Sequence, residues 1–160
     1  MTIKEFRCMD KHLFQRPSFN DPFPKVEEYY NRSLQLQNMG AEIKFVADNL
    51  LTITVSHPNE LHKGGMGVES VNGAVISYLF DLALGLTAYL IRDPKIQTSV
   101  TARLKIRFKK PLITKRIIVY AKVNQTKKNL IDSDVWVFEQ NNQIAASANG
   151  ILMTKTETKS

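Results

Sequence analysis

Hydrophobic and polar residues follow a two-residue period along two stretches near the middle of the chain, residues 42–46 and 50–56. That period is typical of strands with one buried face. The Asp48–Asn49 pair between the two stretches predicts a hairpin turn. We therefore expect a β-hairpin here.

The second half of the chain shows the same alternation at greater length. It predicts four strands joined by hairpins, with Pro111 ending the first and the turn sequences NQTKKN and QNNQ separating the last three. The predicted strands cover residues 98–109, 116–123, 130–139 and 144–153.

One long apolar stretch, SVNGAVISYLFDLALGL and its continuation, lies between these two groups of strands. It predicts a buried helix from Asn72 to Ile91, stopped by Asp93–Pro94. A shorter helix is expected to begin near Pro24 and end before Gly40. The pattern indicates an α+β fold, an antiparallel sheet wrapped around one central helix. We expect an N-terminal extension over residues 1–40 and one main domain over 41–155.

Composition fits this interpretation. A chain of 160 residues with 43% hydrophobic residues has one-domain length and enough apolar surface for a core. Residues 73–91 approach the length of a membrane span, but Asp81 would lie near the bilayer centre, so no span is expected. The single cysteine, Cys8, and the absence of an apolar leader near Met1 favour a cytoplasmic protein.

The charge balance is basic, with 22 Lys and Arg against 15 Asp and Glu, a net charge of +7. Such a charge favours anionic partners or simply keeps the chain soluble. No helix-turn-helix pattern and no aromatic–basic interleaving appears, so nucleic acid is not expected as a partner. The histidines His12, His57 and His62 lack metal-ligand spacing, so neither a metal nor a bound cofactor is expected.

Asp81 is the one carboxylate inside the apolar helix. Residues four apart share a helix face, which groups it with Gly73, Ser77 and Gly85, and Ala88 follows three residues further on. We expect a buried acid beside a stripe of small residues, where either a neighbouring backbone or a ligand chain could approach. An unpaired buried carboxylate is costly, so a partner group is expected.

The start of this helix offers a second chemical group. Ser70 or Asn72 would cap it, which leaves the Gly73 N–H at the positive end of the helix dipole. Asp81 follows two turns later. An oxyanion site and a general base on one helix would suit attack of water on an acyl group.

These residues resemble the hotdog-fold acyl-CoA thioesterases. The helix sequence VNGAVISYLFDLALG has an acid nine residues after Asn72, as in the phenylacetyl-CoA and 4-hydroxybenzoyl-CoA thioesterase types. The segment TARLKIRFKKPL resembles the family's strand with an aromatic residue, two variable positions and Pro. The resemblance covers roughly residues 41–155. It implies a homo-oligomer, a dimer or a tetramer built from dimers, with active sites at the subunit interface.

The resemblance implies hydrolysis of an acyl-CoA, with coenzyme A entering only as part of the substrate. Asp81 would act as base or nucleophile, and the Gly73 amide, aided by Ala74, would hold the oxyanion. Asn72 would either orient the carbonyl or cap the helix. The remaining candidate substrate contacts are Ser77 in the small-residue stripe, Thr98 or Ser99 beside the acid or water, and Lys109 and Lys110 near the CoA phosphates.

One position departs from the family pattern. Both thioesterase types have a functional Asp or Asn six residues before the position that Asn72 occupies here. This sequence has Met66 at that place. Either Asp81 acts without that partner, or Glu60, His62 or Glu69 replaces it, or turnover is lost. The last case would make the chain a non-catalytic acyl-CoA sensor or carrier. A hotdog dehydratase fits less well, because that chemistry uses an Asp–His pair and no His lies near the helix.

Overall fold

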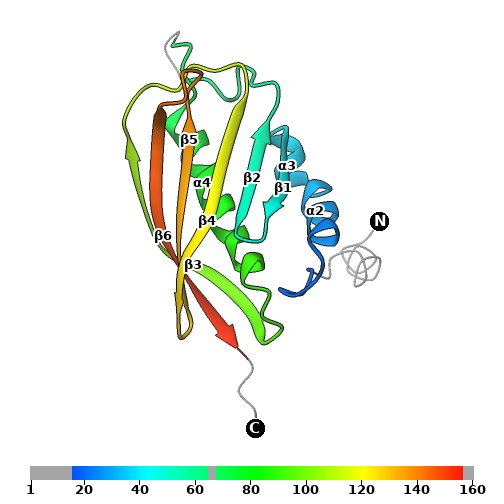
Figure 1. The fold of residues 1–160 in the computed structure, drawn as a ribbon. Coiled ribbons are helices and arrows are strands. Elements are labelled where there is room, and N and C mark those ends of the chain that lie inside the picture. The colour runs from blue at the N-terminus through cyan, green and yellow to red at the C-terminus, as the bar shows by residue number, and fades with distance from the viewer. Residues whose placement is uncertain (1–15, 65–67, 157–160) are drawn as a thin grey trace, which may run out of the picture.

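The computed structural model describes residues 16–64 and 68–156 of the chain. One six-stranded antiparallel sheet, with strand order β1-β2-β4-β5-β6-β3, lies across the long helix α4 (Figure 1). The strands are β1 (Ala41–Ala47), β2 (Leu50–Val55), β3 (Ile96–Phe108), β4 (Ile117–Lys127), β5 (Leu130–Phe138) and β6 (Ile144–Thr156). The α+β architecture predicted from the sequence is confirmed.

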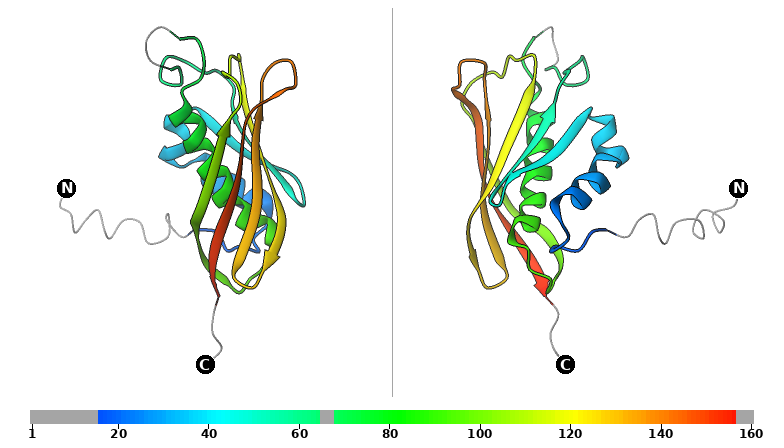
Figure 2. Two further views of the ribbon diagram at one scale, coloured as in Figure 1. Left: turned by 90° about the vertical axis from the view of Figure 1, so that its left-hand side faces the viewer. Right: turned by 45° about the vertical axis from the view of Figure 1, so that its right-hand side comes forward.

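The N-terminal region holds two helices where the sequence predicts one. Helix α2 runs from Phe23 to Asn31 and α3 from Leu34 to Asn38, both lying beside β1 (Figure 2). The single-helix prediction is wrong because Ser33 adopts an extended backbone and its hydroxyl accepts a hydrogen bond from Leu36 N–H at 3.3 Å. A serine that caps a new helix in this way interrupts the previous one. The predicted end is right, since Gly40 follows with φ +57°.

The central helix also differs in its last turn. Helix α4 covers Gly73–Leu86 and continues as a 3₁₀ helix, η1, over Thr87–Ile91. The Thr87 hydroxyl donates to the Leu84 carbonyl at 2.6 Å and accepts from the buried Ser133 hydroxyl at 3.0 Å. The Leu84 carbonyl also accepts from the Thr87 backbone N–H, so both donors of Thr87 hold the tightened turn.

The stretch from Gly73 to Ile91 is long and apolar enough to span a membrane, with a mean hydropathy of 1.8. Here it is the core helix. Its apolar side is buried in the core, and Figure 2 shows the helix lying against the sheet. The fully buried residues of this side include Leu79, Phe80, Ala83 and Leu84.

The β-hairpins follow the prediction with one correction. Asp48 and Asn49 form the turn between β1 and β2, and residues 140–143 form the turn before β6, with Asn142 at φ 61°. Most of the predicted NQTKKN turn is strand instead. Strand β4 continues to Lys127, and only Lys128 and Asn129 turn the chain. A register shift between Val123 and Gln125 lets β4 bend and keep pairing with β5.

The sheet face turned away from α4 carries an aromatic group. Tyr120 stacks on Trp136, the single tryptophan of the chain, at a centroid distance of 5.9 Å, and meets Phe138 at 5.7 Å. The Lys122 ammonium lies 6.0 Å from the Trp136 ring centroid. These residues alternate along β4 and β5 with buried ones that face the helix.

The helix approaches the sheet most closely at Gly150 on β6. A Cβ built on Gly150 would lie 2.3 Å and 2.7 Å from the two methyl carbons of Leu84, which is fully buried. Gly85, the next helix residue, faces the other way and has nothing within 4 Å of a built Cβ. Gly150 therefore lies in a tight contact between helix and sheet, whereas Gly85 faces open space.

We predict that Gly150→Ala lowers the free energy of unfolding by about 1–3 kcal/mol, the usual cost of overpacking a core. Gly85→Ala is the matched control. It should raise the free energy of unfolding by about 0.5–1 kcal/mol, because Gly in a helix interior is less favourable than Ala. Urea denaturation of both variants measures the difference. Equal stabilities would contradict the close helix–sheet contact.

Candidate functional site

Asp81 lies on the side of α4 that the sheet does not cover. Its carboxylate is exposed on the single chain, so the expectation of a buried acid is wrong. The physical reason is that α4 buries its opposite side against the sheet and leaves the row of small residues facing outward. The expected partner group is present, because the Thr101 hydroxyl on β3 donates to Asp81 Oδ1 at 2.8 Å.

Asp81 and Thr101 border a cavity of about 220 Å³. Of the two hydroxyl residues predicted to lie beside the acid, Ser99 lines this cavity and Thr98 does not contribute to its lining. The other walls come from α4, η1, β6 and the N-terminal region, with Tyr78, Leu82, Gly85, Leu86, Tyr89, Leu152, Arg16, Phe19, Tyr30 and Gln35. The cavity thus joins the Asp81 carboxylate and two aliphatic hydroxyls with a wall of mixed polar and apolar side chains.

Sequence reasoning missed Thr101 because of a β-bulge. Counting back from Phe108 in steps of two gives Ile106, Leu104 and then Ala102 on the helix side of β3. The pairing of β3 with β6 skips Ala102, however, between Thr101 and Arg103. The extra residue reverses the alternation and turns Thr101 toward the helix. No residue type in the sequence announces this shift.

The far end of the cavity is formed by two tyrosines. The hydroxyls of Tyr30 and Tyr89 lie 3.0 Å apart, and Tyr89 Oη also donates to the Pro17 carbonyl at 3.3 Å. Burial raises the pKa of Tyr30. Burial, reinforced by the hydrogen bond with Tyr30, raises the pKa of Tyr89 above its ordinary value as well. Both phenols are therefore held in the neutral form.

The start of α4 is organised by Asn72. Its side-chain oxygen accepts from Ala74 N–H at 2.8 Å, so of the two predicted roles for Asn72 the structure has the helix cap. The Ala74 N–H is consequently occupied and is not a free oxyanion donor. Ser77 is half-buried and donates its hydroxyl to the Gly73 carbonyl at 2.8 Å. Within the described residues, the Gly73 N–H has no hydrogen-bond acceptor.

A groove of about 360 Å³ runs beside this helix start and brings Gly73 together with both predicted lysines, Lys109 and Lys110. The Phe108 ring lies over Gly73, 3.5 Å from where a Cβ would be. Lys110 is already engaged, because its ammonium pairs with Glu139 at 3.4 Å and contacts Gln143. Lys109 is exposed and is the better placed cation for an anionic ligand.

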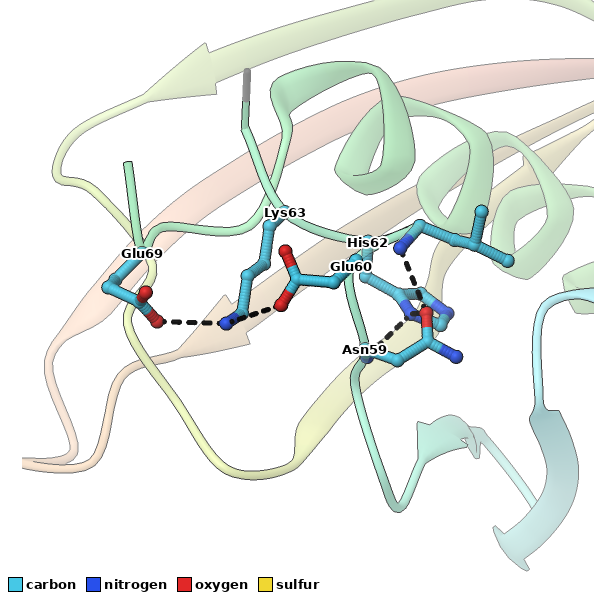
Figure 3. Close-up of polar contacts among 6 residues, drawn as sticks. Asn59, Glu60, His62, Lys63 and Glu69 are labelled. Carbon is cyan, nitrogen blue, oxygen red and sulfur yellow. Dashed lines mark hydrogen bonds and ion pairs between the residues drawn. The ribbon is translucent and has the colours of Figure 1, made fainter. Parts of the chain in front are cut away.

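The loop before α4 is tied down by its own polar side chains (Figure 3). His62 is 2% exposed. Its Nε2 lies 2.8 Å from the Met39 carbonyl, and its Nδ1 lies 3.0 Å from both the backbone nitrogen and the Oδ1 of Asn59. Both ring nitrogens are used in holding the loop, and His62 is not available to replace the missing partner of Asp81.

The two glutamates of this loop are also paired. Lys63 bridges Glu60 and Glu69 at 3.0 Å each, as the dashed lines in Figure 3 mark, and the hydrogen bonds that its ammonium donates to Glu69 and Glu60 raise the pKa of Lys63. The His62 carbonyl accepts from Asn72 N–H at 2.8 Å and so joins the loop to the helix start. Met66 lies outside the described residues.

Asp81 and Gly73 belong to two separate parts of the surface. They are eight residues apart on α4, which corresponds to about 12 Å along the helix axis. A base and an oxyanion donor that act on one carbonyl must both lie within about 3 Å of the reacting atoms. The expectation that one helix supplies both groups to one substrate is therefore wrong for the single chain.

Within residues 16–64 and 68–156, no three His, Cys, Asp or Glu side chains lie together in a way that could hold a metal ion.

Comparison with known proteins adds a family and a fold. Residues 69–146 match the family model of the thioesterase superfamily. No curated protein matches the sequence. Among solved structures, a thioesterase from Haemophilus influenzae superposes with a TM-score of 0.73 at 12% identity, covering 87% of this chain and 94% of that one.

Two further structures agree with this one. The E. coli PaaI protein of the phenylacetic acid degradation operon has a TM-score of 0.68 at 17% identity, over 84% of this chain and 94% of its own. A Streptococcus mutans protein bound to acetyl CoA has a TM-score of 0.61 at 16% identity, over 74% and 91%. Identities this low establish the hotdog fold alone, and the predicted fold class is confirmed.

The buried tyrosine pair predicts a dependence of stability on alkaline pH. Tyrosines of the unfolded chain ionise near pH ~10, whereas Tyr30 and Tyr89 stay neutral in the fold. Their contribution is therefore complete below pH ~10 and is lost as the pH rises above it. Tyr89→Phe removes one such group and should reduce the decline in unfolding free energy by up to about 1.4 kcal/mol per pH unit.

Urea titrations of the wild type and Tyr89→Phe between pH 7 and pH 11 measure this effect. The pH dependence of the two proteins should coincide below pH 9, which serves as the internal control. An equal decline in the unfolding free energy of the two proteins above pH 10 would contradict the predicted contribution of Tyr89.

Proposed function

We propose, since this chain belongs to the thioesterase superfamily, that it is a thioester hydrolase acting on an acyl-CoA. The observation that carries the proposal is the Asp81 carboxylate, which faces a cavity and is oriented by the Thr101 hydroxyl at 2.8 Å. The structural neighbour bound to acetyl CoA supports an acyl-CoA as the substrate class.

Asp81 would supply the chemistry in one of two ways. As a general base, its carboxylate takes a proton from water while the water oxygen bonds to the acyl carbon. As a nucleophile, a carboxylate oxygen bonds to that carbon and forms a mixed anhydride, which water then cleaves. In both routes the carbon–sulfur bond breaks and CoA leaves as a thiolate. Because a thiol ionises near pH ~8.5, the leaving group needs little acid assistance.

Gly73 N–H would hold the developing oxyanion at the positive end of the α4 dipole. The separation of about 12 Å along the helix means that the Gly73 paired with a given Asp81 must come from a second copy of the chain. We propose a dimer in which the Asp81 cavity of one protomer faces the Gly73 groove of its partner. Lys109 beside Gly73 would then meet the CoA phosphates.

The exposed edge of β3 supports this dimer. The strand is 13 residues long and pairs with β6 on one side only. Its Val100 and Phe108 are 59% and 53% exposed. A long edge strand with exposed apolar residues tends to pair with another chain. Pairing of two β3 edges would bring the Asp81–Thr101 side of one protomer next to its partner.

A non-catalytic acyl-CoA-binding protein is the second candidate. One observation favours it: His62 is committed to the Met39 carbonyl, and Glu60 and Glu69 are paired with Lys63. None of the three is a free substitute for the polar partner that other members of the family have. Measurement of turnover separates the two candidates.

Asp81→Asn should lower kcat/KM for acyl-CoA hydrolysis at least ~100-fold, which corresponds to about 2.7 kcal/mol of transition-state stabilisation. The amide keeps the size of the side chain but is neither a base nor a nucleophile. Thiol release from short, long and aromatic acyl-CoAs, followed with a thiol-reactive dye, measures the loss. Asp48→Asn, in the β1–β2 turn, is the matched control and should keep full activity. Tight binding without turnover by the wild type would favour the second candidate.

Ala102→Pro should convert the dimer to a monomer and abolish turnover. Ala102 has no Cα partner in the pairing of β3 with β6, and proline there removes a backbone N–H donor at the bulge of this edge strand. Light scattering should give twice the 18.2 kDa chain mass for the wild type and for Ala102→Ser, and the single mass for Ala102→Pro. A monomeric and active wild type would contradict the shared site.

A further inference from the structure

The cavity beside Asp81 is bounded at its far end by a part of the chain that the family match does not reach. Arg16, Phe19, Tyr30 and Gln35 line it there, and all four precede residue 69, where the match begins. They come from the segment before α2, from α2 and from the start of α3. These residues from outside the matched range close a pocket otherwise built by α4, η1, β3 and β6.

This boundary is closely packed. Phe19 and Tyr89 are each 2% exposed, and their ring centroids lie 4.7 Å apart. Tyr30 meets Tyr89 edge-on at 5.7 Å, with the two hydroxyls 3.0 Å apart. The Arg16 guanidinium lies over the Phe19 ring, 4.6 Å from its centroid. Three aromatic rings thus form a continuous end wall.

Helix α2, which carries Tyr30, is fixed to the sheet and holds the wall in position. The Asn31 side chain both accepts from Ile43 N–H at 2.8 Å and donates to the Ile43 carbonyl at 3.2 Å. Glu27 accepts from Phe45 N–H at 2.7 Å. These bonds use backbone groups of the edge strand β1, so α2 is attached to that strand at Ile43 and at Phe45. A wall anchored in this way does not yield easily to a longer ligand.

The space between Asp81 and this wall follows the helix. Gly85 lies one turn after Asp81 and has nothing within 4 Å of a built Cβ, so the path along the helix is open there. Tyr89 closes it one turn later. Eight residues correspond to about 12 Å. An extended chain covers roughly 1.2 Å per bond, so about ten carbons would reach the wall.

We propose that the aromatic wall of Phe19, Tyr30 and Tyr89 sets an upper limit on acyl length, with Phe19 as the specificity-determining residue. The inference rests on the acyl-CoA hydrolysis proposed above. Acyl groups of up to about ten carbons fit between Asp81 and the wall. A single ring on a short chain also fits, since a cavity of about 150 Å³ already accommodates benzene and this one measures about 220 Å³.

The test compares kcat/KM across straight-chain acyl-CoAs from acetyl to palmitoyl. The wild type should be most active at or below decanoyl-CoA and should discriminate against myristoyl-CoA. Phe19→Ala should raise kcat/KM for myristoyl-CoA about 10-fold relative to octanoyl-CoA, which is about 1.4 kcal/mol of transition-state discrimination. Phe19→Leu removes less of the wall, keeps an apolar side chain in the core, and should give a smaller shift in the same direction.

Phe23→Ala is the matched control. Phe23 belongs to the same N-terminal region, stacks on Phe45 at 4.4 Å and does not line the cavity. Phe23→Ala removes the same side-chain atoms as Phe19→Ala and should loosen the packing of the N-terminal region to a similar degree. The ratio of kcat/KM for myristoyl-CoA to that for octanoyl-CoA should nevertheless stay as in the wild type. An equal shift in Phe23→Ala would mean general loosening and would overturn the role of Phe19.

The outcomes separate this inference from the function on which it rests. An active wild type whose length profile is unchanged in both Phe19 variants overturns the length limit and leaves hydrolysis standing. If the wild type releases no thiol, hydrolysis fails, and the length limit is read from binding of non-hydrolysable acyl-CoA thioether analogues. Affinity that drops beyond the ten-carbon analogue and recovers in Phe19→Leu supports the limit, and a flat profile overturns it.

Discussion

A helix laid across a sheet buries only one side, and the site of this protein is determined by which side of α4 that is. The contact of Leu84 with Gly150 fixes both the depth and the rotation of the helix, because no Cβ stands between them. Once that side is buried, the row containing Gly73, Asp81 and Gly85 lies outside the core, toward the β3 edge of the sheet. Core packing therefore exposes the carboxylate, and the acid itself contributes little to the choice of side.

Hydrogen bonding then divides the polar groups around α4 into two classes. Asn72, Ser77 and His62 are committed to backbone atoms and hold the helix start and its loop. Within residues 16–64 and 68–156, Asp81 Oδ2 and the Gly73 N–H make no hydrogen bond. The distinction matters because a group already satisfied within the fold must break a bond before it can serve a ligand.

Much of this could be predicted from the sequence, and the failures have physical causes. The apolar length of α4 and the strand alternation predicted the fold, which is confirmed, and the isolation of Asp81 within α4 singled out that residue as a candidate whose role stays a prediction. Thr101 was not predicted because the bulge at Ala102 reverses the alternation, and no residue type in the sequence indicates that bulge. The break at Ser33 and the exposure of Asp81 depend on a local cap and on packing partners far away in sequence, which the periodicity of a single helix does not encode.

The aromatic group on the outer face of the sheet has a practical consequence for spectroscopy. Trp136 is the single tryptophan, and its neighbours are Tyr120, Phe138 and Lys122 on the face opposite α4. Its fluorescence therefore reports the solvent and ring contacts of that face, and the sheet stands between the indole and the Asp81 cavity. The intrinsic emission of this protein is a monitor of sheet integrity, and ligands of the helix side need a reporter of their own.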